Sequence, residues 1–163
     1  MKNRLNENNG FTLIEMIVSL LLAGVISVFA GMGISMIIDG YSLTSKNAEI
    51  THKGQLALTR LSKEFSYISS VSSGTATAIS YNSYKQNALN SHTVSWTGDK
   101  LFLDGDLISD SVGSLELGYY DSFNGAEQTS WAAGSRIIEI TLSFVGANNN
   151  NIVFTTRIMP RNI

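Results

Sequence analysis

The chain has 163 residues, a formal net charge of -2 and a sequence pI of about 5.6. This charge balance argues against a nucleic-acid-binding protein, which normally carries a basic patch. The absence of cysteine excludes disulfide bonds and cysteine-based zinc, redox or thiol chemistry. Charged residues make up 15% of the chain, below the quarter that is usual in soluble domains, and most of the deficit lies in the N-terminal third.

The first ten residues, MKNRLNENNG, are polar, and their basic start, Lys2 and Arg4, is partly offset by Glu7. Basic residues that flank an apolar segment tend to stay in the cytoplasm. We therefore expect the N-terminus to remain in the cytoplasm and the C-terminal part of the chain to cross the membrane.

An apolar run follows, and residues 11–38 form a candidate membrane segment. No charged residue occurs from Met16 to Ile38. As a helix this stretch would span roughly 35 Å, enough to cross about 30 Å of hydrocarbon. A secretory signal peptide has a shorter apolar core and a small-residue cleavage site, which this run lacks. A plain transmembrane anchor fits the length but leaves Glu15 unexplained, because an acid within an apolar segment usually has a function.

The stretch from Gly10 to Glu15, GFTLIE, suggests a third interpretation. With the short basic leader it closely resembles the prepilin signal of type IV pilins and type II secretion pseudopilins. The resemblance implies that a membrane prepilin peptidase cleaves between Gly10 and Phe11 and methylates the new amino group of Phe11. A glycine suits the cleavage site, because a residue without a Cβ lets a protease approach the backbone closely.

The same resemblance implies a role for Glu15. After cleavage Phe11 would carry an α-ammonium group, and in a packed filament core this group and the Glu15 carboxylate would both lose water. An unpaired charge is strongly unfavourable there, whereas a paired one is tolerated. Glu15 would therefore neutralise the Phe11 amine of its own or a neighbouring subunit and help set the axial register. The alternative is that Glu15 merely lies at the lipid headgroup boundary.

Residues 39–68 are expected to continue the helix as an amphipathic segment that ends near Tyr67. Six residues recur at spacings of three and four and predict one buried stripe: Ile50, Gly54, Ala57, Leu61, Phe65 and Ile68. Lys46, Lys53 and Arg60 recur every seven residues on another face. This basic stripe indicates a solvated face or, alternatively, a contact with acidic patches on neighbouring subunits.

Residues 69–163 are predicted to form a β-rich head. Residues 69–74, SSVSSG, are expected to be a linker or loop. Strands are expected at residues 76–81, 93–96, 101–103, 107–109, 115–120, 136–145 and 152–159. Gly98 and Asp104-Gly105 supply turns, and residues 146–151 join the last two strands into a hairpin. Residues 121–134 lack periodicity and are interpreted as a loop.

This order matches the α+β pilin fold, in which a long N-terminal helix, half transmembrane and half amphipathic, packs on a C-terminal antiparallel β-sheet. The expected organisation is a leader at 1–10, a transmembrane and assembly half at 11–38, an amphipathic half at 39–68 and a head at 69–163. A β-meander that ends in a strand followed by Pro160-Arg161-Asn162 further resembles minor subunits, such as the J-type pseudopilin or the W-type minor pilins. Glu15 disfavours the K-type pseudopilin, which typically lacks this acid.

The head is expected to have no catalytic site, cofactor or metal. His52 and His92 belong to no metal-binding or triad pattern. Four aspartates alternate with expected strands and are interpreted as turn residues rather than calcium ligands: Asp99, Asp104, Asp106 and Asp110. Tyr119, Tyr120 and Trp131 are interpreted as core residues rather than an adhesive surface.

The sequence therefore favours a non-enzymatic structural subunit, more specifically a minor one, of a type IV pilus or type II secretion pseudopilus. Its expected partners are the prepilin peptidase, other pilins or pseudopilins through the N-terminal helix, an inner-membrane assembly platform and membrane lipid, with no nucleic acid. The precursor is expected in the inner membrane with its head outside the cytoplasm, and the mature protein in a surface pilus or periplasmic pseudopilus. A filament-displayed adhesin or substrate-binding module and a plain single-span anchor with a β domain remain as alternatives.

Overall fold

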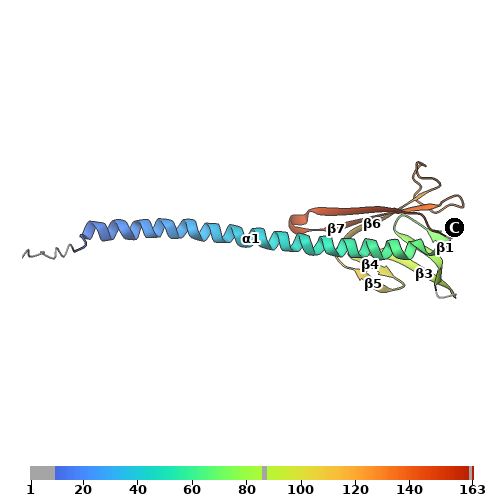
Figure 1. Cartoon of the computed structure of the whole chain (residues 1–163), viewed down its shortest axis with the longest axis horizontal. Helices are drawn as coiled ribbons and strands as arrows, with labels where there is room; N and C mark the ends of the chain where they lie inside the picture. Colours follow the sequence, from blue (N-terminus) through green and yellow to red (C-terminus); the bar gives the residue numbers. More distant parts are fainter. Residues whose placement is uncertain (1–9, 86–87, 162) are drawn as a thin grey trace, which may run out of the picture. The chain divides into compact units, whose positions relative to one another are not determined.

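A computed structural model describes residues 10–85, 88–161 and 163, so residues 1–9 of the expected leader lie outside the described part. The chain divides into two compact units, one that ends at Ser42 and one from Leu43 to Ile163. A single helix, α1 (Leu13–Ser66), contributes residues to both units (Figure 1). The fold class is confirmed: a long N-terminal helix, apolar in its first part, packs through its later residues on antiparallel β-sheets.

The predicted buried stripe lies on the part of α1 that belongs to the second unit. The buried helical residues are Ile50, Gly54, Ala57, Leu61 and Phe65. Ile68, the sixth predicted member, is also buried but lies in the first strand, because the helix ends at Ser66. The spacing of three and four thus indicated correctly which helix face meets the sheets.

Five strands form one antiparallel meander in the order β1-β2-β3-β4-β5. They are β1 (Ile68–Gly74), β2 (Ala78–Lys85), β3 (Ala88–Thr97), β4 (Lys100–Leu103) and β5 (Asp106–Ser109). The predicted Asp104-Gly105 turn joins β4 to β5, with φ values of 55° and 86°. Positive φ at both central residues is what a type I′ hairpin turn requires.

A second, three-stranded sheet has the order β6-β7-β8, so the head contains two sheets where one was expected. Its strands are β6 (Val112–Tyr120), β7 (Ile137–Val145) and β8 (Asn151–Ile158), and a 3₁₀ helix, η1 (Ala147–Asn149), joins the last two. The predicted C-terminal hairpin is present, with Leu142 opposite Phe154. The meander and this sheet are separated at Ser111, whose φ of 60° breaks the extended chain.

The prediction of a linker at residues 69–74 was wrong, because these residues belong to β1. Val71 pairs with Tyr81 of β2, so the backbone of this serine-rich segment is ordered by its neighbour rather than by its own apolar content. Strand β3 likewise begins at Ala88 rather than at residue 93, and its polar first half pairs with β2 along its whole length.

The core lies where the buried stripe of α1 meets the inner faces of the strands. Phe65 packs edge-on against Tyr81, with 5.5 Å between ring centroids. Gly54 allows the helix to lie close to β8, because a Cβ at this position would lie 2.2 Å from Cε2 of Phe154. The head therefore closes its own core around the second part of the helix.

Candidate functional site

The predicted cleavage site lies outside the helix. Gly10 and Phe11 precede α1, which begins at Leu13, and the side chain of Phe11 is 76% exposed. Exposed, non-helical backbone is what a protease can bind in an extended form. The Gly10–Phe11 bond is thus accessible in the chain as folded.

Thr12 caps the start of α1. Its Oγ1 accepts a hydrogen bond from the Glu15 amide at 3.4 Å, and its carbonyl oxygen accepts from the Met16 amide at 3.2 Å. Threonine followed three residues later by glutamate is the sequence signature of a capping box and could have identified this cap. Of the two capping-box bonds, the described residues show the one from the Glu15 amide to Thr12 Oγ1. Glu15 therefore lies in the first turn of the helix, where a carboxylate is favoured by the positive end of the helix dipole.

The helix that follows presents apolar side chains around its whole circumference. From Gly10 to Ser42 every residue is exposed, and α1 is long and apolar enough by length and composition to cross a membrane. Ser19 and Ser27 donate their hydroxyl hydrogen bonds to the carbonyl oxygens of Glu15 and Ala23, at 2.7 and 2.8 Å. These bonds satisfy the hydroxyl groups within the helix, so the surface is suited to apolar surroundings.

In the head, His92 and Asp104 form a pair that no sequence pattern predicts. Nδ1 of His92 lies 2.6 Å from Oδ2 of Asp104, and the Thr93 amide donates to Oδ1 at 2.7 Å. Burial acts to raise the pKa of Asp104, but the hydrogen bonds from His92 and Thr93 outweigh it and hold the pKa below its usual value. The pair ties β3 to the β4–β5 turn.

Asp110 forms an ion pair with Lys53 of α1. Its Oδ1 lies 2.9 Å from Nζ of Lys53, which also lies 3.0 Å from Glu49. The hydrogen bond from Lys53 lowers the pKa of Asp110. One residue of the basic stripe thus fastens the helix to the sheets, while Lys46 and Arg60 are exposed. Among the residues that the structure describes, no three acidic or histidine side chains are grouped to hold a metal ion.

Tyr119 lies in the core and Trp131 packs against it, as predicted, whereas Tyr120 is buried outside the core, beneath the guanidinium group of Arg157. Tyr119 and Tyr120 are buried, and the ring of Trp131 packs edge-on against Tyr119 at 5.7 Å. The hydroxyl group of Tyr119 donates to the carbonyl oxygen of Thr75 at 2.8 Å. Burial raises the pKa of Tyr119.

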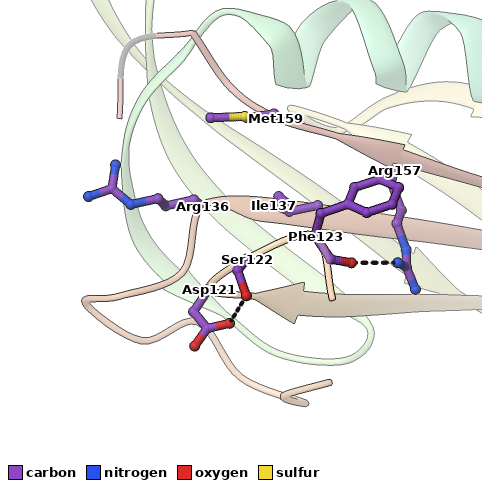
Figure 2. A pocket seen from close by; sticks show the side chains of 7 residues that line it. All are labelled: Asp121, Ser122, Phe123, Arg136, Ile137, Arg157 and Met159. Carbon is purple, nitrogen blue, oxygen red and sulfur yellow. Dashed lines mark hydrogen bonds between the residues drawn. The ribbon is translucent and has the colours of Figure 1, made fainter. Parts of the chain in front are cut away.

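A pocket of about 280 Å³ lies where β7 begins and β8 ends (Figure 2). Its lining residues are Asp121, Ser122, Phe123, Arg136, Ile137, Arg157 and Met159. Arg157 is held in place, because it binds Glu139, donates to the Phe123 carbonyl oxygen at 3.3 Å and lies 4.4 Å above the Tyr120 ring. Arg136 is exposed, and no carboxylate in the described part of the chain pairs with it.

Comparison with known proteins points to the N-terminus. Residues 5–31 match the family described as the prokaryotic N-terminal methylation motif. This motif is typical of type IV pilins and pseudopilins and implies processing by a prepilin peptidase. The match includes Gly10, Phe11 and Glu15 and ends within the apolar part of α1. No curated protein and no solved structure gives a significant match to the chain.

Proposed function

We propose that the chain is a structural subunit of a type IV pilus or type II secretion pseudopilus, which is stored in the membrane, cleaved after Gly10 and assembled into a filament. The observation that carries this proposal is the methylation motif at the start of a wholly exposed apolar helix. A self-contained β head on the same helix supports it, because such a chain needs an apolar environment only for its N-terminal part.

Each residue of the motif has a role in this proposal. Gly10 and Phe11 form the cleavage site, and Phe11 becomes the methylated N-terminus. Glu15 then neutralises the Phe11 ammonium of its own or a neighbouring subunit. Thr12 keeps Glu15 in the first turn of the helix, close in sequence to the new terminus. In a complete capping box the glutamate carboxylate would bind the amide of the cap residue, but the capping bond seen here uses only the Glu15 amide, so the carboxylate is left for the ammonium group.

The finer assignments belong to the same proposal. The segments are the leader at 1–10, the transmembrane and assembly half at 11–38, the amphipathic half at 39–68 and the head at 69–163. The precursor lies in the inner membrane with its N-terminus in the cytoplasm, and its partners are the prepilin peptidase, other subunits and the assembly platform. A minor subunit of the J or W type is favoured, and shearing cells and quantifying this chain against other filament subunits tests that assignment.

Processing is the decisive test. The intact mass of the full chain, purified from cells with and without an active prepilin peptidase, is expected to differ by residues 1–10 and one added methyl group. A Phe11 N-terminus would also exclude the plain single-span anchor. Retention of Met1 in membranes that contain active peptidase would overturn the proposal. A peptidase substrate of unrelated sequence, expressed in the same cells, serves as the control for peptidase activity.

A further inference from the structure

The two sheets have four outer edges, and three of them are blunted. Strand β1 carries two register irregularities, and β5 has only four residues with an irregularity in its pairing. Strand β6 is covered, because Leu117 donates to Ala76 at 2.8 Å and Tyr119 exchanges backbone hydrogen bonds with Gln128 at 2.9 Å. Bulges, short length and coverage are the means by which proteins protect sheet edges from pairing.

The fourth edge, β8, has none of these protections. Its eight residues pair with β7 without any register irregularity, and the strand contains no proline or lysine. Within residues 10–85, 88–161 and 163, no backbone hydrogen bond reaches this strand from any element other than β7. Val153 is 58% exposed on it. A regular, exposed edge of this length can accept another strand.

The alternation of hydrogen bonds along β8 shows which of its backbone N–H and C=O groups have no partner on β7. The Gly146 amide donates to the Asn150 carbonyl at 2.7 Å, which makes the next pair, Val145 and Asn151, a non-hydrogen-bonded one. The alternation along an antiparallel pair then directs Ile152, Phe154 and the following even-numbered residues to β7. Val153, Thr155 and Arg157 therefore point their N–H and C=O groups away from the sheet.

Arg157, the one charged residue of β8, does not protect this edge from pairing with another strand. Arg157 binds Glu139 on β7 and lies over Tyr120 on β6, so its guanidinium group leans inward across the sheet. The pocket described above lies at the end of the same strand, with Met159 as one wall and the unpaired Arg136 beside it (Figure 2). An open edge thus leads to a mainly apolar pocket whose lining carries two further charges, the unpaired Arg136 and Asp121, whose carboxylate accepts a hydrogen bond from the Ser122 hydroxyl group.

We propose that the free edge of β8 pairs with an extended segment of a different filament subunit. One apolar side chain of this segment enters the pocket beside Met159, and a carboxylate next to it binds Arg136. Backbone pairing supplies affinity in such strand addition, and side-chain pockets supply specificity. Charge complementarity with Arg136 favours an acidic residue at the position that reaches this guanidinium group, because the Asp121 carboxylate of the same pocket already accepts a hydrogen bond from Ser122.

A second copy of this chain fits the edge less well. Subunits of one filament point in the same direction, so identical chains would need two different open edges to pair, and the other three edges are blunted. A symmetric pair of β8 strands would place the two chains in opposite directions. This reasoning rests on the proposed function, since it assumes a polar filament.

Amide hydrogen exchange tests the pairing on the full, processed chain. Exchange is compared between the detergent-solubilised chain and sheared filaments. On assembly, the amides of Val153, Thr155 and Arg157 are expected to exchange at least about tenfold more slowly, because each gains a hydrogen bond. Phe154 and Thr156 provide an internal control, since their amides already bind β7 in the free chain.

Matched lysine variants separate pairing from folding. Val153→Lys is expected to abolish the protection of Thr155, because an edge lysine opposes strand addition. Leu107→Lys, on the blunted β5 edge where Leu107 is 51% exposed, is expected to leave it unchanged. Thr155→Pro, which removes an outward N–H group and spares the ladder to β7, is a second variant with the same expected loss.

The partner is identified through a single introduced thiol. Because the chain contains no cysteine, Met159→Cys provides the only site for a thiol-to-amine crosslinker in this subunit. An adduct with a different subunit, lost in Val153→Lys, supports the proposal, and an adduct with a second copy overturns it. Unchanged exchange at residues 153–157 in a chain that is cleaved and filament-bound also overturns it, while leaving the proposed function intact. Retention of residues 1–10 overturns both.

Discussion

The two parts of α1 differ in how their apolar side chains are covered. Phe29, in the first unit, is 70% exposed, whereas Phe65, in the second, is 0% exposed. No residue from Gly10 to Ser42 is buried, although this part of the helix is the more apolar one. One continuous helix thus has a part that packs against the rest of its own chain and a part whose apolar side chains the described chain leaves uncovered.

The largest effect is expected from Glu15→Val, which tests whether the exposed part of the helix is an assembly surface. The variant should remain membrane-inserted and be cleaved, but the Phe11 ammonium would lack a partner in the filament core. Leaving a buried charge unpaired costs about 3–5 kcal/mol, so incorporation into sheared filaments should fall by far more than tenfold.

The control is Glu49→Val, an exposed acid on the same helix, which should be incorporated normally. Wild-type incorporation of Glu15→Val would show that neutralisation of the Phe11 amine is not needed.

Phe65→Ala and Phe29→Ala compare the two parts directly. Phe65 contacts the Tyr81 ring in the closed core, and its truncation is expected to lower the free energy of unfolding of the head by about 3–5 kcal/mol. Phe29→Ala should leave the head unchanged. Both tryptophans, Trp96 and Trp131, lie in the head, so fluorescence during denaturation of the detergent-solubilised chain reports on the head alone. Equal losses in the two variants would contradict the division into two independent units.

Alanine substitutions at two glycines of α1, one in each unit, are expected to differ less in their effect on the stability of the head. A Cβ at Gly54 would lie 2.2 Å from the Phe154 ring, so Gly54→Ala is expected to destabilise the head by about 1–3 kcal/mol. At Gly33 the added Cβ would meet no atom within 4 Å beyond its chain neighbours and the nearby helix backbone, and Gly33→Ala should leave the unfolding midpoint of the head unchanged. The double variant Gly54→Ala/Phe154→Leu should recover part of the loss, and no recovery would mean that Phe154 is not the clashing group.

The smallest expected effect concerns the ion pair between Asp110 and Lys53. Because the pKa of Asp110 is lowered in the folded state, the pair stabilises the head above the unfolded-state pKa. That stabilisation is lost as the pH falls through the lower, folded-state pKa. The denaturation midpoint of Asp110→Asn should therefore lie slightly below that of the wild type near neutral pH and merge with it well below about pH 4. Asp106→Asn, in the neighbouring strand, is the control, and a gap that persists in acid would exclude this ion pair as its cause.

The helix and the C-terminal hairpin could be predicted from the sequence because their periodicity is strong. The stripe from Ile50 to Phe65 and the alternation along β7 each mark a face that is buried. Strand β1 could not be found in this way, since SSVSSG contains one apolar residue and owes its order to β2. The division into two sheets could not be predicted either. The alternation of apolar and polar residues predicts where a strand lies but not which other strand it pairs with.

Within the sites, local signals were predictable and distant pairs were not. Gly10, Phe11 and Glu15 stand close together in the sequence, and Thr12 could have been identified as the helix cap from its spacing to Glu15. The pairs His92–Asp104 and Lys53–Asp110 depend on the register of β3 with β4 and on where the helix crosses the sheets. The pocket at Arg136 joins segments whose proximity only the fold determines.

The contacts between α1 and the C-terminal hairpin also determine how the head would respond to mechanical force. Asn47 accepts a hydrogen bond from the Ala147 amide at 2.9 Å, Gly54 lies against Phe154, and Ser66 accepts from the Arg161 amide at 3.4 Å. The residue numbers of α1 and of the C-terminal hairpin therefore rise together along this row of contacts, which means that α1 and β8 run in the same direction. Tension applied through the N-terminal part of the helix would load these contacts together, in shear, instead of peeling them apart one at a time. Such an arrangement resists force that is applied along the helix axis.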